Sequence, residues 1–465
     1  MKKVNALTSI VLVLILVLSV FAGCSSGGSK VSEESTSSGT DSGSVSTDNN
    51  DNKTQTQSEI TFLDTMPTPE RTELLKNMIA KFEAANTSVK VEYTSVPWDE
   101  AYKKVVTMGA SNTLPDVVTT DVGIMLALAQ PGYAEKLTDK WNNWKYKDDL
   151  TQAAIVASNL YTYDGDIYVI PDGFLLQGIF VRTDWLEELG IDPVSLQNWT
   201  WDDYFDVIKK MTDKDKNRYG IAFRGGANGF LRFYEFLGSN LQVTNAFPDG
   251  TNKSILEDPR AIDLFKQFYG LYTEGYAPKE SINWGFKEMV EGFVNGQCGT
   301  LNQTPEVTVT CQQNMEEGIW TVLPQPKTKG ATKNHMTWGY SAGYLMSSSS
   351  KNKDGTWAFI EFMSSPEMNL EYSKGFGCLP IYKSCLEDSY FQSGALKGYA
   401  DQLLDPNIEY FSQPTDLTQW GYFLAEYSKT EVQKYMSGKQ SAEDTMANLA
   451  QWMREQYDKD VAGKQ

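Results

Sequence analysis

The chain has 465 residues, of which 41 are basic and 60 acidic, so its formal net charge at pH 7 is −19. Nucleic acids and anionic lipid surfaces are bound through clustered Lys and Arg, and this acidic balance argues against both as partners. The single histidine, His335, excludes metal sites with two histidines. The length is sufficient for two domains with large buried cores.

The first 23 residues are typical of an export signal. Lys2 and Lys3 precede a short apolar run at 10–22, which is too short for a permanent transmembrane helix. Cys24 directly follows small residues, a pattern that resembles the lipobox of bacterial lipoproteins, in which the cysteine is lipidated. Phe21 stands where leucine is usual there. The alternative is an ordinary cleaved signal followed by a chance cysteine.

Residues 24–58 are predicted to form a disordered tether. They consist mostly of Ser, Thr, Gly, Asp, Asn and Gln, with Val31 and Val45 as the only larger apolar side chains. Such a segment buries too little apolar surface to offset its ordering entropy. As a flexible coil it would span about 30 Å.

From Glu59 the pattern changes to alternating strands and helices. We predict strands at 60–63, 89–94 and 116–120, and helices at 70–85, 98–110 and 122–129. This order indicates a parallel sheet covered by helices. Asp64 and Asp121 each follow a strand directly, at the sheet edge where ligands bind in such folds. The alternative role for each is a helix N-cap.

The alternation continues along the rest of the chain. The predicted strands are 167–171, 178–181, 219–223, 299–301 and 340–346, and the predicted helices are 184–189, 204–211, 262–272, 357–363 and 441–457. Two α/β lobes fit this length and pattern better than one.

Motifs that could indicate catalysis or metal binding have simpler interpretations. Gly339–Gly343 matches Gly-x-Ser-x-Gly, but a strand continues after it and His335 precedes the serine, so we interpret the match as chance. His335 is predicted to be a surface residue. Asp213 begins a stretch similar to a calcium loop, but Arg224 stands where the final acidic ligand belongs. A helix-to-strand turn is the preferred interpretation there.

Four cysteines besides Cys24 leave two possibilities open. Cys298, Cys311, Cys378 and Cys385 are either buried free thiols or include one disulfide, for which Cys378 and Cys385 are the nearest pair in sequence. No Cys-x-x-Cys pair occurs, which argues against zinc.

Three tryptophans next to glycine are candidate ligand platforms. Trp284, Trp338 and Trp420 each lie beside a glycine in a predicted loop or strand start. Sugar rings have apolar faces that stack on aromatic rings, and carboxylates and amides bind their hydroxyls. The alternative role for each tryptophan is packing. The remaining candidate ligand-binding residues are Asp64, Asp121, Asp172, Phe174, Arg232, Glu235, Asn302 and Gln303.

Several segments in order resemble the extracellular solute-binding proteins (family 1) of bacterial sugar importers. These segments are KFEAANTSVKVEY, ASNTLPDVVTTD, YDGDIYVIP, GIFVRTDWLEELGID, NWTWDDY, MVEGFVNGQCGT, VLPQP and GFGCLPIYKS. Cys298 and Thr300 depart from the usual pattern. The resemblance implies a two-lobed α/β fold of the periplasmic-binding-protein type (class II), with a ligand cleft between lobes joined by crossing strands. The expected N-terminal lobe comprises 59–170 and about 340–377, and the C-terminal lobe 171–339 and about 378–465.

The same resemblance implies a function. The protein is expected to bind a carbohydrate outside the cell, as a monomer without a cofactor, and to deliver it to an ABC-type permease. Lipid on Cys24 would hold it at the outer face of the cell membrane, in a bacterium without an outer membrane. No ATP-binding phosphate loop occurs. The alternatives are a surface glycoside hydrolase, a solute-binding partner of a membrane sensor, or a lipoprotein for peptides or other solutes.

Overall fold

The computed structural model describes residues 57–337, 343–405, 407–414 and 416–462. The predicted signal peptide, Cys24, the tether up to residue 56, Trp338 and most of the Gly339–Gly343 motif lie outside the described residues. For these positions the predictions stay as they are.

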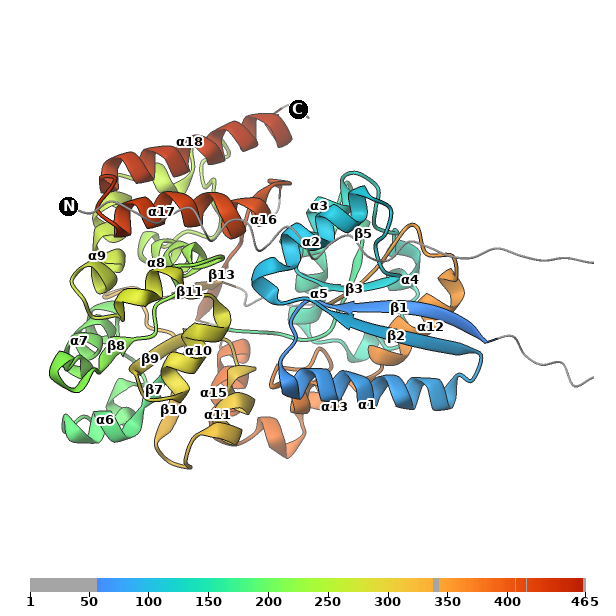
Figure 1. The fold of residues 1–465 in the computed structure, drawn as a ribbon, viewed down its shortest axis with the longest axis horizontal. Coiled ribbons are helices and arrows are strands. Elements are labelled where there is room, and N and C mark those ends of the chain that lie inside the picture. Colours follow the sequence, from blue (N-terminus) through green and yellow to red (C-terminus); the bar gives the residue numbers. More distant parts are fainter. Residues whose placement is uncertain (1–56, 338–342, 406, 415, 463–465) are drawn as a thin grey trace, which may run out of the picture. The chain divides into compact units, whose positions relative to one another are not determined.

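One body of the protein is built on a five-stranded sheet with the strand order β2-β1-β3-β12-β6 (Figure 1). Its strands are β1 (Ser58–Asp64), β2 (Val89–Ser95), β3 (Val117–Thr120), β6 (Val169–Pro171) and β12 (Gly343–Met346). β1 pairs in parallel with β2 and β3, whereas β12 runs antiparallel to β3 and β6. We call this sheet and its helices the first lobe.

Alternating residues of these strands supply two separate cores. Phe62 packs with the helices on one face, and Leu63 with those on the other. The first face is covered by α1 (Pro69–Ala85), α12 (Lys353–Met363) and α13 (Pro366–Phe376), and the second by α2 (Trp98–Ala110) and α3 (Val122–Ala129). The predicted β-α-β-α-β-α order of the first 70 folded residues is confirmed.

The second body is built on a four-stranded sheet with the order β10-β7-β9-β8. Its strands are β7 (Gly178–Arg182), β8 (Tyr219–Ile221), β9 (Cys298–Gln303) and β10 (Trp320–Pro324). One face packs against α7 (Trp201–Met211), α8 (Phe230–Leu241), α9 (Ala261–Thr273) and α18 (Ala442–Asp460), and the other against α10 (Phe286–Val294) and α11 (Val307–Asn314). We call this body the second lobe.

Shorter elements complete the two lobes. The short strands are β4 (Thr162–Tyr163), β5 (Asp166–Ile167), β11 (Asn334–Thr337) and β13 (Ile408–Phe411). The further helices are α4 (Thr138–Asn142), α5 (Gln152–Leu160), α6 (Thr183–Glu188), α14 (Lys383–Leu386), α15 (Gly394–Leu404), α16 (Trp420–Tyr422) and α17 (Ser428–Met436). Single turns occur at Lys147–Asp149, Pro193–Leu196, Lys214–Lys216, Ile255–Glu257, Lys279–Asn283 and Ser389–Phe391, and a π turn at Phe423–Tyr427.

The chain passes between the lobes more than once. Residues 172–177 connect β6 of the first sheet to β7 of the second, and all six are buried. β11 and β13 pair in parallel with each other and contact α8 of the second lobe. Side chains from Cys378 to Ala400 belong to the core that contains Phe62. The two-lobed α/β fold is confirmed, while the exact lobe boundaries stay a prediction.

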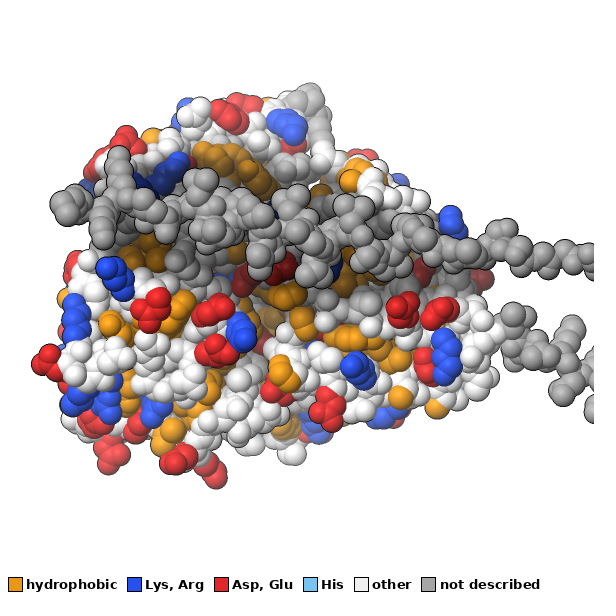
Figure 2. Space-filling view, viewed as in Figure 1, with side chains coloured by type: hydrophobic (Ala, Val, Ile, Leu, Met, Phe, Trp, Pro, Cys, Tyr) orange, Lys and Arg blue, Asp and Glu red, His pale blue; other side chains and the backbone are white. Residues whose placement is uncertain are grey.

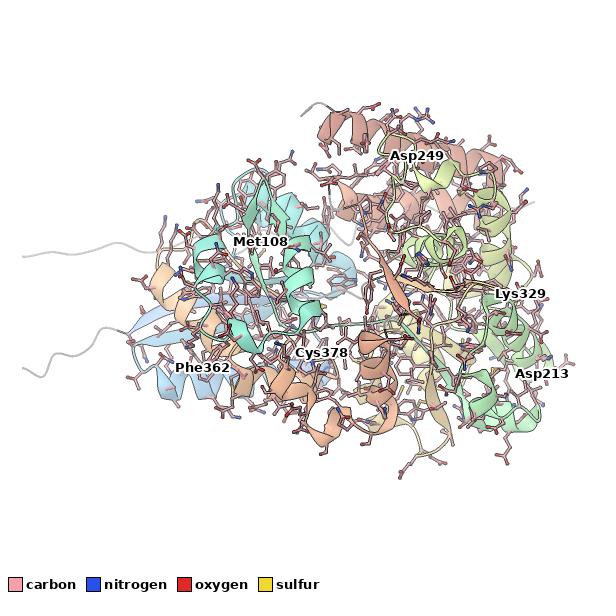
Figure 3. The ribbon with its side chains drawn as sticks, turned by 180° about the vertical axis from the view of Figure 1, so that it is seen from behind. Met108, Asp213, Asp249, Lys329, Phe362 and Cys378 are labelled. Atoms are coloured by element: carbon pink, nitrogen blue, oxygen red, sulfur yellow. The ribbon has the colours of Figure 1, made fainter. Side chains whose placement is uncertain are left out.

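The structure decides the predictions made for His335 and for the four cysteines. His335, predicted to be a surface residue, is only 6% exposed, because β11 carries it into the protein beside Glu409. This prediction was wrong. Cys298, Cys311, Cys378 and Cys385 are buried free thiols. The thiols of Cys378 (Figure 3) and Cys385 bond different groups, Ser373 Oγ and the Pro366 carbonyl.

The described surface is mixed in charge. Figure 2 shows acidic and basic side chains interspersed on the face drawn, with Lys and Arg scattered rather than gathered. Among the described residues, no helix combines the length and apolar character needed to cross a membrane. Asp213 caps the turn at Lys214–Lys216, where the helix-to-strand turn was predicted.

Candidate functional site

A small pocket lies between the two lobes. The starts of α2 and α3 line it from the first lobe, and the loop before α8 together with α16 and the π turn lines it from the second. Its lining residues are Trp98, Tyr102, Asp121, Gly123, Ile124, Asn228, Gln413, Trp420, Gly421 and Leu424. We call it the interlobe pocket. Its volume of about 20 Å³ leaves room for about one water molecule.

Asp121 lines the interlobe pocket on the side of the first lobe. It follows β3 directly and is the N-cap of α3, where its Oδ1 accepts a hydrogen bond from the Ile124 amide at 2.8 Å. Burial raises the pKa of the Asp121 carboxyl to about 6, although backbone donors favour the charged form. The N-cap role is therefore confirmed, and the same side chain lines the interlobe pocket.

Trp420 lines the interlobe pocket on the side of the second lobe. Its indole Nε1 donates to Gln413 Oε1 at 2.6 Å, and its ring stacks on Phe423 with centroids 5.1 Å apart. The tryptophan is 1% exposed and opens α16 rather than standing free in a loop. It therefore packs as a core residue and also contributes to the pocket wall.

The lobes touch beside this pocket through two glycines. A Cβ atom added to Gly123 would lie 2.9 Å from the Gly421 Cα, and one added to Gly421 would lie 2.4 Å from the Tyr102 ring. Backbone approaches backbone here because neither residue has a side chain. The two lobes are therefore in direct contact at this edge of the interlobe pocket.

Four predicted residues of the second lobe lie together around one guanidinium. Arg232 donates to Glu235 Oε1 at 2.8 Å, to Gln303 Oε1 at 2.9 Å and to the Asn302 carbonyl at 3.3 Å. With its amide oxygen turned toward Arg232, Gln177 adds a further acceptor at 2.9 Å. These groups are nearly all buried and bond one another. They form a buried hydrogen-bond network inside the second lobe.

Asp64 is placed inside the first lobe. One of its oxygens accepts from Arg71 Nε at 3.0 Å, and the other from the Tyr93 hydroxyl at 3.1 Å. Asp64 and Arg71 are both completely buried. The arginine also packs over the Phe376 ring, 4.4 Å from its centroid. Asp64 is thus used by its own lobe, and its predicted ligand contact has no support from this geometry.

Asp172 lies next to the same arginine, at the start of the passage between the lobes. Its Oδ2 atom is buried, and no hydrogen bond within the described residues reaches it. Burial raises the pKa of the Asp172 carboxyl to about 6, while the Arg71 charge acts in the opposite direction. Phe174, two residues on, is fully buried and pairs its backbone with Leu379. Both residues support the passage between the lobes.

Trp284 is not a free platform either. It precedes α10 and is 8% exposed, with its ring so close to Gly292 that an added Cβ would lie 2.7 Å from it. The Trp-Gly pattern predicts an accessible ring face, but it does not say on which side of the backbone the ring lies. Here the ring packs on α10, inside the second lobe.

The sequence interpretation missed several residues that the structure brings to the interlobe pocket. Trp98 and Tyr102 lie one turn apart at the start of a correctly predicted helix, so a pair of aromatic residues in a first turn was an available signal. Asn228 and Gln413 lie in irregular segments that gave no signal. Glu306, which does not line the interlobe pocket, was not singled out either; burial raises the pKa of its carboxyl, and the hydrogen bond with Thr304 together with the Arg232 and Arg71 charges partly offsets this.

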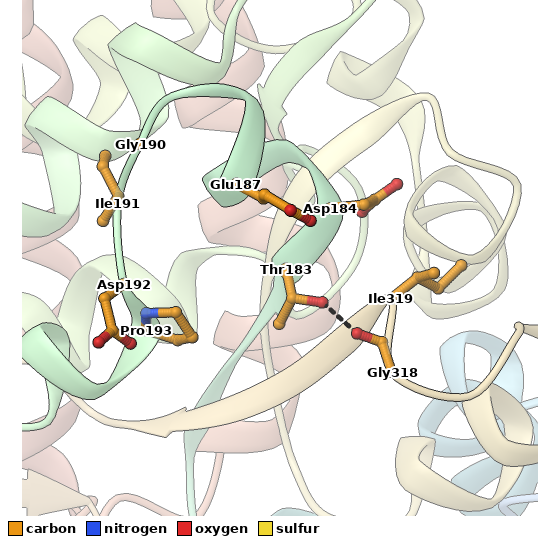
Figure 4. A pocket seen from close by; sticks show the side chains of 9 residues that line it. All are labelled: Thr183, Asp184, Glu187, Gly190, Ile191, Asp192, Pro193, Gly318 and Ile319. Carbon is orange, nitrogen blue, oxygen red and sulfur yellow. Dashed lines mark hydrogen bonds between the residues drawn. The ribbon is translucent and has the colours of Figure 1, made fainter.

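A larger hollow lies within the second lobe (Figure 4). Its volume is about 470 Å³, and it is lined by Thr183, Asp184, Glu187, Gly190, Ile191, Asp192, Pro193, Gly318 and Ile319. No aromatic side chain lines it, and only one lobe contributes. The interlobe pocket is smaller but combines aromatic, amide and carboxylate groups from both lobes. Within the described residues, no cluster of His, Cys, Asp and Glu could hold a metal ion.

Comparisons with known proteins agree with this architecture. Residues 68–370 match the family model described as bacterial extracellular solute-binding protein. A putative binding protein of Brucella abortus (strain 2308) is 22% identical over 317 residues, which cover 68% of this chain and 74% of that protein.

Solved structures show the same fold. An ABC substrate-binding protein of Listeria monocytogenes in complex with cycloalternan superposes with a TM-score of 0.73 at 19% identity, covering 86% of this chain and 98% of that one. Maltose-bound MalE3 of T. maritima also gives a TM-score of 0.73, at 20% identity, with coverage of 85% and 99%.

Proposed function

The chain belongs to the bacterial extracellular solute-binding proteins, and from this premise we propose that it binds a carbohydrate, specifically a neutral oligosaccharide, between its two lobes. The observation that carries the proposal is the composition of the interlobe pocket. Trp98 and Tyr102 offer aromatic faces for sugar rings beside the buried Trp420, and Asp121, Asn228 and Gln413 offer hydrogen-bonding groups for hydroxyls.

Binding requires the lobes to separate. A pocket of about 20 Å³ admits no sugar ring, so the ligand must enter an open form and be enclosed when the lobes close. Similar proteins that carry cycloalternan and maltose in their structures support the choice of a carbohydrate over other solutes. The protein would then bind and release its ligand without chemical change.

Asp121 provides the test of the site. Asp121→Asn should weaken binding of an oligosaccharide by about tenfold or more, because a carboxylate that accepts from sugar hydroxyls is replaced by an amide. Asp192→Asn is the matched control, since Asp192 is also a helix N-cap that accepts a backbone hydrogen bond, at 2.9 Å, but lies in the second lobe's outer hollow. Calorimetric titration with maltotriose, lactose and chitobiose measures both variants.

Equal affinity of the two variants for every glycan that the wild type binds would contradict the site. Cleavage products in the titrated sample would instead support the glycoside hydrolase alternative. Chromatography of the mixture after the titration detects them.

We further propose that the protein is anchored through lipid on Cys24 and delivers its ligand to an ABC-type permease. Cys24→Ser should release the protein from the cell surface into the medium, as followed by fractionation. Capture of a sensor kinase rather than a permease by the anchored protein would favour the sensor alternative.

A further inference from the structure

A carboxylate of the first lobe reaches across to the second. Asp99 lies in the first turn of α2, whose Ala101 and Val105 pack in the core of the first lobe. Its Oδ1 accepts from the Arg224 guanidinium, and its Oδ2 accepts from the Phe286 amide at 3.0 Å. Both oxygens of one side chain are thus bound by the opposite lobe.

The second-lobe groups that bind the Asp99 carboxylate are of the kind that stabilises a negative charge. Phe286 is the first residue of α10, and amides at a helix N-terminus lack partners within the helix and carry partial positive charge. The Arg224 side chain is 6% exposed, and its Nε is buried without a hydrogen bond inside the described part of the chain. A charged, nearly dry guanidinium beside a helix start attracts a carboxylate strongly.

Gly285 makes room for that carboxylate. A Cβ atom added at this position would lie 2.2 Å from Asp99 Oδ2, closer than any non-bonded contact allows. Its backbone φ of −88° is one that alanine adopts readily. An alanine at this position would therefore have to displace the Asp99 carboxylate, although the backbone conformation itself tolerates alanine.

We propose that Arg224, Gly285 and the first turn of α10 form a carboxylate cradle that Asp99 enters when the lobes close, and that this contact latches the closed form. The inference rests on the proposed function in one respect, the separation of the lobes to admit a ligand. The latch acts without ligand, so it sets how much of the free protein is closed and hence how readily a ligand enters.

The test measures the distance between the lobes in ligand-free protein. Nitroxide labels are placed at Lys104→Cys on α2 and Glu291→Cys on α10, both exposed positions, in a Cys24→Ser background. The four remaining cysteines are buried and escape labelling. Double electron–electron resonance then reports the short, closed distance and any longer, open one.

Two variants remove the latch in different ways. Asp99→Asn removes the charge, and Gly285→Ala fills the space that the carboxylate needs. Each should raise the open-to-closed ratio by about tenfold or more, because hydrogen bonds to charged groups are lost. Glu100→Gln removes a neighbouring charge from the same helix turn, and no hydrogen bond or ion pair of the Glu100 side chain occurs in the described structure, so its distances should match the wild type.

Unchanged distances in both Asp99→Asn and Gly285→Ala would overturn the latch. So would an equal shift in Glu100→Gln, which would indicate a general charge effect. A lower Tm in both latch variants with no change in distance would show a merely structural contact. The measurement uses no sugar, so it succeeds or fails independently of the carbohydrate titration.

Discussion

At the scale of single residues, the first lobe depends on a buried ion pair. Arg71 is held by Asp64, by the Tyr372 hydroxyl and by the ring of Phe376, all inside the core. Removing one partner of such a pair leaves an uncompensated buried charge, which is far more destabilising than the loss of a surface pair.

Arg71→Ala should therefore lower the free energy of unfolding by about 3–5 kcal/mol. Lys81→Ala is the control, because Lys81 pairs with Glu371 at the surface, with its side chain 52% exposed, and should change stability by less than about 1 kcal/mol. Urea denaturation of both variants measures the difference. Similar losses in the two variants would contradict the structural role of the buried pair.

Asp172 makes stability depend on pH. Burial raises the pKa of its carboxyl to about 6 in the folded protein, whereas in the unfolded chain the pKa is near its ordinary value of 3.8, so the folded state holds the proton more tightly. The stabilising effect is complete below about pH 4 and is lost as the pH rises from about 4 to 6.

Asp172→Asn removes this titration. The stability of the wild type relative to this variant should fall by about 1–3 kcal/mol between about pH 4 and 6.5, because each pH unit that separates the folded and unfolded pKa values corresponds to about 1.4 kcal/mol. Denaturant unfolding at several pH values measures it. A difference that stays constant, or grows with pH, would show that Asp172 does not titrate in this way.

At the scale of elements, close packing of α7 on β8 depends on a glycine. A Cβ atom at Gly220 in β8 would lie 1.9 Å from the Ile208 carbonyl oxygen of α7, which is backbone and cannot rotate away. Gly398 in α15, in contrast, has no atom within 4 Å of an added Cβ.

These two positions give opposite expectations for the same substitution. Gly220→Ala should destabilise the protein by about 1–3 kcal/mol or more, because the helix must move off the sheet. Gly398→Ala should stabilise it by about 0.5–1 kcal/mol, because alanine favours a helix interior. Thermal unfolding compares them, and a shift of Tm in the same direction for both would refute the packing argument.

The local pattern predicted the elements better than the site. The helices at 98–110 and 122–129 follow directly from their apolar spacing and flanking turns, and the structure has the same bounds. α8 was not predicted, although it carries Arg232 and Glu235 and its apolar residues are spaced as in an amphipathic helix, so this signal was present in the sequence and was not used.

Contacts between residues far apart in the sequence explain why several predicted site residues have other roles in the structure. Asp64 was predicted to follow a strand and is the last residue of β1, but its partner Arg71 is supplied by the packing of α1, which no local pattern encodes. Trp420 and Trp284 bury their rings because neighbouring helices cover them. The interlobe pocket joins residues more than 290 positions apart, such as Asp121 and Gln413, so only the fold brings them together.

At the scale of the whole molecule, two α/β lobes meet at several separate groups. Gly123 touches Gly421, and Asp99 is bound by Arg224 and the Phe286 amide. The Tyr399 hydroxyl, from the core that contains Phe62, also donates to the Gln303 carbonyl of β9 at 3.1 Å, and the chain itself passes between the lobes. Such an arrangement permits hinge motion, and the interlobe pocket is enclosed only when the lobes are together.

The central claim is that this molecule closes around a carbohydrate. It is tested most directly by titrating the unmodified protein with maltotriose, lactose and chitobiose while following tryptophan emission. Trp98 and Trp420 line the pocket, so binding and closure should change the emission and saturate with a single affinity. A saturable response to at least one glycan is predicted, and no response to any sugar across a broader oligosaccharide panel would contradict the account.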